Sequence, residues 1–153
     1  MGKYEIRSEF SPSGKGSAEN WVRKRFVKET NFYRSRHAQT ALIVVIDADT
    51  GTVQDRLRQL DQSLKESGKP VVDPGSEQIA RLVPRRNVET WILCLNGRLV
   101  DETTDYKQGN DWSKLTAHAA GTLFQWVRSG DKLPPDCIDS LRIGIRELNH
   151  LQF

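Results

Sequence analysis

No apolar run in this 153-residue sequence approaches the roughly 18 residues that a membrane-spanning helix needs. The first residues also lack the apolar core of a secretory signal peptide. Internal repeats and low-complexity tails are missing as well. We therefore expect a cytoplasmic protein without membrane contact, in which residues 1–153 form a single globular domain.

Cysteine and histidine are scarce, with two and three copies respectively. Cys94 and Cys137 lie far apart in the sequence, and each stands in an apolar stretch with helical spacing. His37, His118 and His150 are isolated from one another, and we assign them no role. We therefore expect neither a zinc site nor a disulfide framework.

The formal net charge of +3 is modest, but the basic residues are unevenly placed. One predicted helix carries six of them, opposed within that span only by Glu29: Arg23, Lys24, Arg25, Lys28, Arg34 and Arg36. A second group consists of Arg81, Arg85 and Arg86. A solvated surface is the simplest explanation of such clusters. Two basic groups beside an acidic site are also typical of proteins that bind phosphate backbones.

The most informative stretch of the chain is residues 41–53, ALIVVIDADTGTV. Five consecutive apolar residues at 42–46 predict a strand buried on both faces, as in the centre of a parallel sheet. The run ends in Asp47-Ala48-Asp49, at the carboxyl end of the strand, where open α/β sheets bind ligands. Side chains alternate along a strand, so we expect both carboxylates on the same side. Paired carboxylates favour Mg²⁺ or Mn²⁺.

The same residues have a purely structural explanation. Asp, Thr and Gly form turns and helix caps, and Thr50-Gly51-Thr52 leads directly into a helix. Glu89, which follows the good N-cap residue Asn87, can likewise serve only the electrostatics of a helix end.

The spacing of apolar residues predicts alternating strands and helices. Besides 42–46, strands are expected at residues 3–10, 69–73 and 82–84. Helices are expected at residues 17–36, 53–67, 87–97, 112–129 and 135–151. This order predicts an α/β fold with a small, mostly parallel sheet flanked by helices. Residues 1–107 would form its core and residues 108–153 a helical extension.

Asp47-Ala48-Asp49 after a buried strand, together with Pro84-Arg85-Arg86-Asn87-Val88-Glu89 opening a later helix, resembles the TOPRIM family. Topoisomerases, primases, nucleases of the overcoming-lysogenization-defect type and small prokaryotic defence proteins share that fold. The resemblance implies Mg²⁺ (or Mn²⁺) held by Asp47 and Asp49. TOPRIM domains also begin with a strand that ends in Glu-Gly. This chain has no Glu-Gly, and Glu9, then Glu5, is the nearest candidate.

The resemblance implies metal-dependent hydrolysis of phosphodiester bonds in nucleic acid, DNA more than RNA. Asp47 and Asp49 are the expected metal ligands, and Glu89 or Glu9 would supply a further metal contact or transfer a proton. Lys107 is expected to stabilise charge on the phosphate.

The basic residues are expected to hold the nucleic-acid backbone without reading its sequence. The residues that we assign to this role are Arg23, Lys24, Lys28, Arg85 and Arg86. A protein partner or a second copy of the chain can complete the site.

Two other functions fit the sequence. One is a TOPRIM-like module that binds nucleic acid or regulates a partner without catalysis. The other is a phosphatase of the haloacid dehalogenase type, whose Asp-x-Asp-Gly-Thr motif differs from residues 47–52 by one inserted residue. In that enzyme class the first Asp is a covalent nucleophile and the second a general acid.

Overall fold

The computed structural model describes residues 5–12, 18–36, 39–130 and 132–152. The described part of the chain contains helices and a parallel two-stranded sheet, which confirms a small α/β fold. Its elements, in chain order, are α1 (Ala18–Ser35), β1 (Leu42–Val45), α2 (Val53–Glu66), β2 (Ile79–Leu82), α3 (Val88–Leu95), α4 (Trp112–Arg128) and α5 (Asp139–Asn149). No described helix is long and apolar enough to cross a membrane.

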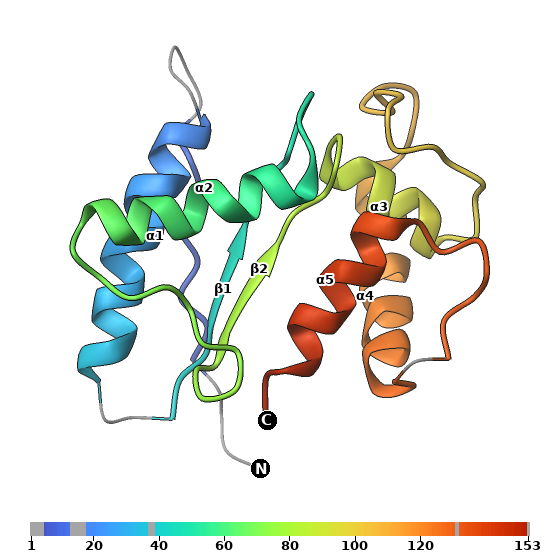
Figure 1. The fold of residues 1–153 in the computed structure, drawn as a ribbon. Coiled ribbons are helices and arrows are strands. Elements are labelled where there is room, and N and C mark those ends of the chain that lie inside the picture. The colour runs from blue at the N-terminus through green and yellow to red at the C-terminus, as the bar shows by residue number, and fades with distance from the viewer. Residues whose placement is uncertain (1–4, 13–17, 37–38, 131, 153) are drawn as a thin grey trace.

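The two strands lie in the middle of the molecule, between two groups of helices (Figure 1). Helices α1 and α2 pack together beside β1, and α5 packs against β2 with α4 and α3 next to it. Leu42 of β1 pairs with Ile79 of β2, and the register continues to Val45 and Leu82. Both strands therefore end at the same edge of the sheet.

Two apolar clusters stabilise these two groups. The first joins β1, α1 and α2 and has Phe26, Leu60 and Leu64 at its centre. The second joins β2, α3, α4 and α5, and both free cysteines are buried in it. The helices after residue 107 thus share a core with β2 and α3.

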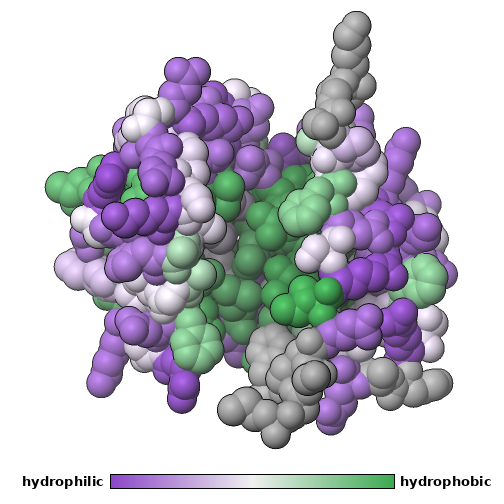
Figure 2. Space-filling view, turned by 180° about the vertical axis from the view of Figure 1, so that it is seen from behind, coloured by the Kyte–Doolittle hydropathy of each residue, from purple (hydrophilic) through white to green (hydrophobic). Residues whose placement is uncertain are grey.

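Strand β1 is not buried on both faces, which corrects the expectation from its apolar run. Leu42 and Val44 pack into the cluster with α1 and α2, whereas Ile43 and Val45 are about half exposed, at 47% and 48%. Figure 2 shows apolar surface gathered in a hollow of the molecule on the side opposite to Figure 1. The strand is more exposed than predicted because helices cover only one of its faces.

The predicted strand at residues 3–10 is wrong for its described part, residues 5–10, which form no strand. Ile6 and Phe10 are more than 80% exposed. Ion pairs attach this segment to α1 instead of ladder hydrogen bonds to β1, since Arg7 contacts Glu29 at 2.9 Å and Glu9 contacts Arg25. Alternation alone does not make a strand when side-chain charges find partners elsewhere.

Two further strand predictions need correction. Residues 69–73 form no strand, and the second strand covers Ile79–Leu82 rather than 82–84. The missing N–H of Pro84 breaks the regular ladder after Leu82, although the Pro84 carbonyl still accepts from the N–H of Ala48.

Helix prediction was more accurate because local capping signals fix helix ends. Thr52 caps α2, with its hydroxyl accepting from the N–H of Asp55 at 3.1 Å, and Asn87 caps α3. Helix α4 ends one residue earlier than predicted. Helix α5 begins at Asp139 instead of 135, because Pro134 and Pro135 occupy the turn before it. Ser17, at which the first helix is predicted to begin, lies outside the described residues.

Candidate active site at the carboxyl ends of the strands

Hydrogen bonds between the two chain segments continue beyond the ends of β1 and β2. The N–H of Ile46 donates to Leu82 O at 3.0 Å, and the N–H of Ala48 donates to Pro84 O at 2.8 Å. The loop after β1 and the loop after β2 therefore rise next to each other (Figure 1). This pairing brings the Asp47-Ala48-Asp49 segment beside the segment that opens α3.

Asp47 is the central carboxylate of this edge. Its neighbours Ile46 and Ala48 are buried toward α2, so the Asp47 side chain leaves on the opposite face. No hydrogen bond or ion pair reaches its carboxylate from the described residues. Burial, and then the nearby Glu89 carboxylate, raise the pKa of Asp47 to about 6, although Lys107 and Arg56 act to lower it.

Asp49 points to a different partner. Its backbone has a φ of 56°, in the left-handed region that residues other than glycine rarely adopt. Its Oδ1 lies 2.6 Å from Nη1 of Arg86. Regular strand alternation is thus lost before Asp49, and the expectation that the two carboxylates project side by side from one strand does not describe this loop.

Glu89 lies in the first turn of α3, where the helix dipole favours a negative charge. The buried Asn87 fixes this helix end, because its Oδ1 accepts from the N–H and the hydroxyl of Thr90 at 3.3 and 3.1 Å. Glu89 also contributes to the field at Asp47. The same side chain therefore serves both the helix end and the acidic cluster.

Sequence reasoning missed Asp105, which connects the loop after α3 to this edge. Its Oδ1 accepts from Asn87 Nδ2 and from the N–H of Lys107, both at 3.0 Å. Its Oδ2 lies 3.7 Å from Nη2 of Arg86. Hydrogen bonds from the Lys107 N–H and the charges of Lys107 and Arg86 hold the pKa of Asp105 low, although burial opposes them. Asp105 was recognisable only as one of three acids in a loop.

Comparisons of the chain with models of known protein families, with curated proteins and with solved structures found no match. The TOPRIM resemblance therefore rests on the motif residues themselves. Four of the residues that it singles out, Asp47, Asp49, Glu89 and Arg86, lie at this one edge of the sheet, together with Lys107.

The structure does not bring Glu9 to this cluster. Its carboxylate is paired with Arg7 at 2.7 Å and with Arg25 on α1, and it is not among the charges that act on Asp47. Glu5 is exposed.

The carboxylate oxygens at this edge are of the kind that a hard divalent cation prefers. Asp47 and Glu89 offer carboxylate oxygens, whereas Asp49 is paired with Arg86. In the described part of the chain, no three Asp, Glu, His or Cys side chains are grouped closely enough to hold a metal ion.

The predicted nucleic-acid residues divide into engaged and free cations. Arg23 of α1 donates to the hydroxyl of Ser63 at 3.2 Å, which connects α1 to α2. It also pairs with Glu19 of the same helix. Lys24 and Lys28 are exposed on α1, and Arg85 is exposed beside the acidic edge. Only part of the basic character of α1 is therefore available to a ligand.

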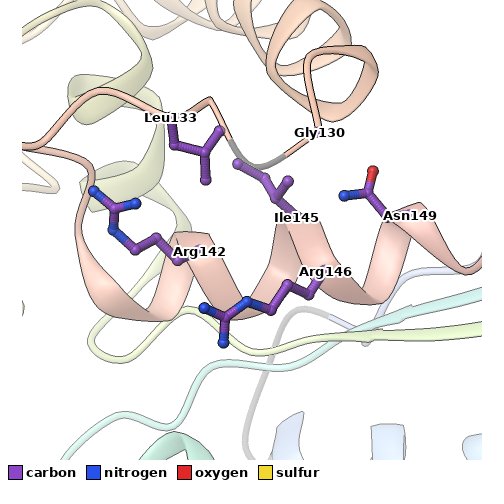
Figure 3. A pocket seen from close by; sticks show the side chains of 6 residues that line it. All are labelled: Gly130, Leu133, Arg142, Ile145, Arg146 and Asn149. Atoms are coloured by element: carbon purple, nitrogen blue, oxygen red, sulfur yellow. The ribbon is translucent and has the colours of Figure 1, made fainter.

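A hollow of about 370 Å³ beside α5 shares no residue with the acidic edge. Arg142 and Arg146 line it, but Arg142 donates to the main-chain oxygens of Pro134 at 2.6 Å and Cys137 at 3.0 Å. In Figure 3 the Arg146 side chain extends away from Leu133, across the helix. These arginines do not converge on one point, so the hollow lacks the features of an anion site.

Proposed function

We propose that this chain hydrolyses phosphodiester bonds of nucleic acid with the help of a divalent cation. The observation that carries this proposal is the state of Asp47, a partly buried carboxylate without a partner among the described residues. Glu89 and Lys107 lie near this carboxylate. Burial of such a charge without a hydrogen bond or an ion pair lowers the stability of the folded protein, which supports a functional role.

The carboxylates have distinct roles in the proposal. Asp47 and Asp49 would hold Mg²⁺ or Mn²⁺, with Glu89 as a further contact or as the acceptor of a proton. A bound ion of this type makes water nucleophilic and neutralises the leaving oxygen. A raised pKa at Asp47 also supports the proposal, because a divalent cation relieves the repulsion between neighbouring carboxylates.

The cations at the same edge would contact the phosphate. Lys107 and Arg86 reach the acidic edge from the loop after α3 and from the segment before α3. Fixed positive groups next to the phosphate stabilise the extra charge of the transition state. Lys24 and Lys28 would hold more distant phosphates of the same strand without reading bases.

The test is cleavage of supercoiled plasmid and of single-stranded DNA with Mg²⁺ or Mn²⁺, with and without EDTA. Asp47→Asn removes the charge while keeping the shape, and we expect a loss of about 1000-fold in rate, because it removes a ligand of the metal. Asp136→Asn, at an exposed position away from this edge, is the matched control and should cleave normally. Cleavage by Asp47→Asn at the wild-type rate would contradict the assignment.

A second candidate is a nucleic-acid-binding or regulatory module without catalysis. Two observations favour it: Asp49 is paired with Arg86, and no three-acid group that could hold a metal ion is present among the described residues. This candidate predicts binding of DNA that weakens with salt, together with no cleavage in either Mg²⁺ or Mn²⁺.

A further inference from the structure

The two buried cysteines lie against each other, although the sequence separates them widely. Cys94 is in the last turn of α3, and Cys137 lies just before α5. Each is only 5% exposed, and both belong to the apolar cluster that joins β2, α3, α4 and α5. A hydrogen bond between the two thiols acts on the pKa of each. The fold therefore creates a dithiol pair that sequence spacing does not reveal.

Contacts next to the thiols hold α3 against the start of α5. Trp91 Nε1 donates to Ser140 Oγ at 2.8 Å. The Trp91 ring also lies so close to Gly144 that a side chain at position 144 would collide with it. Cys94 follows Trp91 by three residues on α3, and residues three apart share one face of a helix. Because Cys137 precedes Ser140 by the same interval, it lies opposite Cys94.

Main-chain contacts fix the turn that carries Cys137. The N–H of Cys137 donates to Pro134 O at 3.1 Å. Arg142 donates to the main-chain oxygens of Cys137 at 3.0 Å and of Pro134 at 2.6 Å. Glu102 accepts from the N–H of Ser140 at 2.9 Å, which anchors the first turn of α5. The sulfur of Cys137 therefore stands on a turn with a defined position next to α3.

The interaction makes the two thiols chemically unequal. It lowers the pKa of Cys94, although burial opposes this effect, and it raises the pKa of Cys137. The thiolate is the nucleophilic form of cysteine, so Cys94 is the sulfur that reacts first with an oxidant. Cys137 is then the resolving thiol at its side.

We propose that Cys94 and Cys137 form a redox site, at which a peroxide converts the two thiols into a reversible disulfide between α3 and the start of α5. Disulfides in reducing compartments are usually transient and redox-sensing, which suits a pair of free cysteines. This inference goes beyond the function proposed above and needs no metal ion.

The reaction has two steps. The Cys94 thiolate attacks one oxygen of the peroxide, the O–O bond breaks, hydroxide leaves, and the sulfur becomes a sulfenic acid. The Cys137 sulfur then displaces the sulfenic oxygen, so that an S–S bond forms, the S–O bond breaks and water is released. The two sulfurs together lose two electrons, and the peroxide gains them.

The experiment treats the reduced, folded protein with hydrogen peroxide and follows its intact mass. We expect the wild type to lose two hydrogen atoms, and peptide mapping to place the new bond between Cys94 and Cys137. Dithiothreitol should restore the original mass. Because a cross-link restricts the unfolded chain, oxidation should also raise the Tm by about 5–10 °C.

Two variants and a labelling experiment test the roles of the two thiols. Cys94→Ser and Cys137→Ser each remove one sulfur, so neither variant should lose the two hydrogen atoms. In Cys137→Ser, dimedone, a reagent for sulfenic acids, should label Cys94. In the reduced wild type, brief treatment with iodoacetamide should modify Cys94 about tenfold faster than Cys137. Thermal unfolding of each reduced variant verifies that it is folded.

Several outcomes would overturn the proposal. One is a wild type whose mass is unchanged, or which gains oxygen atoms at both sulfurs without losing hydrogen. Another is a disulfide between two chains or a Tm that oxidation lowers, since either would show that the fold does not hold the sulfurs in bonding position. Faster modification of Cys137 would overturn the assigned order of the two thiols. None of these results bears on metal-dependent cleavage, so failure here is distinguishable from failure of the proposed function.

Discussion

Asp47 is a single residue whose charged form lowers the stability of the folded protein. Its carboxylate is partly buried next to Glu89, and neither a hydrogen bond nor an ion pair from the described residues compensates it. Ordinary structural carboxylates in this chain differ, because Asp101 accepts from Thr103 and Thr104 and has its pKa lowered by them. The contrast argues that Asp47 is placed for a ligand.

The first prediction at this scale is that the effect of Asp47 on the free energy of unfolding depends on pH. The pKa of Asp47 in the folded state, about 6, lies above its ordinary value of 3.8. The native state therefore binds more protons than the unfolded state between these two values, and the free energy of unfolding falls as pH rises through this window. Asp47→Asn should raise the free energy of unfolding by about 1–2 kcal/mol near pH 7, after discount for solvent screening.

The measurement is urea unfolding of wild type and Asp47→Asn at several pH values, without metal. Near pH 4 the wild-type carboxyl is mostly protonated, so the two proteins should have similar stability. A stabilisation that is equally large at both ends of the range would show that charge is not the cause. Destabilisation at neutral pH would remove the argument that Asp47 is a strained carboxylate.

The roles of single acids were only partly predictable from the sequence. Asp47 and Asp49 were identifiable because they follow an apolar strand. Asp101, Glu102 and Asp105 looked alike, as three acids in one loop. In the structure Asp101 orders its own loop, Glu102 accepts from the N–H of Ser140 on α5 at 2.9 Å, and Asp105 supports the acidic edge. These differences depend on contacts with distant segments, which local patterns do not encode.

At the scale of elements, signals confined to a few neighbouring residues predicted structure well. Caps at Thr52 and Asn87, followed by glycines with positive φ at Gly68 and Gly97, set the ends of α2 and α3. Strands were predicted less well, because pairing depends on a partner elsewhere in the chain. Residues 5–10 have the alternating pattern of a strand, yet their charges bind α1.

Helix α3 provides the second prediction, since its first turn holds Glu89 at the acidic edge. Asn87→Ala removes the cap, leaves the buried Thr90 hydroxyl without its acceptor and frees Asp105 from one donor. We expect a loss of about 2–3 kcal/mol in the free energy of unfolding. The same variant should weaken DNA cleavage beyond this stability effect, because Glu89 and the Asp105 loop lose their common support.

Thr52→Ala is the matched control, because it removes a helix cap from α2 with one hydrogen bond to the Asp55 N–H. Its expected cost is about 1 kcal/mol. Equal costs for Thr52→Ala and Asn87→Ala, measured by urea unfolding, would contradict the view that Asn87 connects two segments in addition to capping a helix.

At the scale of the whole molecule, the distribution of charge differs from the count of basic residues. Helix α1 carries five basic residues, but Arg23, Arg25 and Arg34 form ion pairs with Glu19, Glu29 and Glu77. The first two pairs lie within α1, the third connects α1 to the segment before β2, and all three offset positive charge. Lys24 and Lys28 are exposed and form no ion pair with a described residue. The long-range attraction for a phosphate backbone should come mainly from such free cations.

The salt dependence of DNA binding tests which of these basic residues contact the nucleic acid. Each lysine that contacts a phosphate releases about one counterion on binding, so the double variant Lys24→Ala/Lys28→Ala should reduce the slope of log affinity against log salt by about 2. Arg23→Ala should leave the slope nearly unchanged and instead lower stability, because Arg23 connects α1 to Ser63 of α2.

Lys114→Ala, at an exposed position of α4, serves as the control for general charge. An equal reduction in slope for Lys114→Ala would mean that net charge, and not the surface of α1, attracts the nucleic acid. An unchanged slope in the double variant would place the nucleic acid elsewhere on the molecule, with the acidic edge approached from the side of α3.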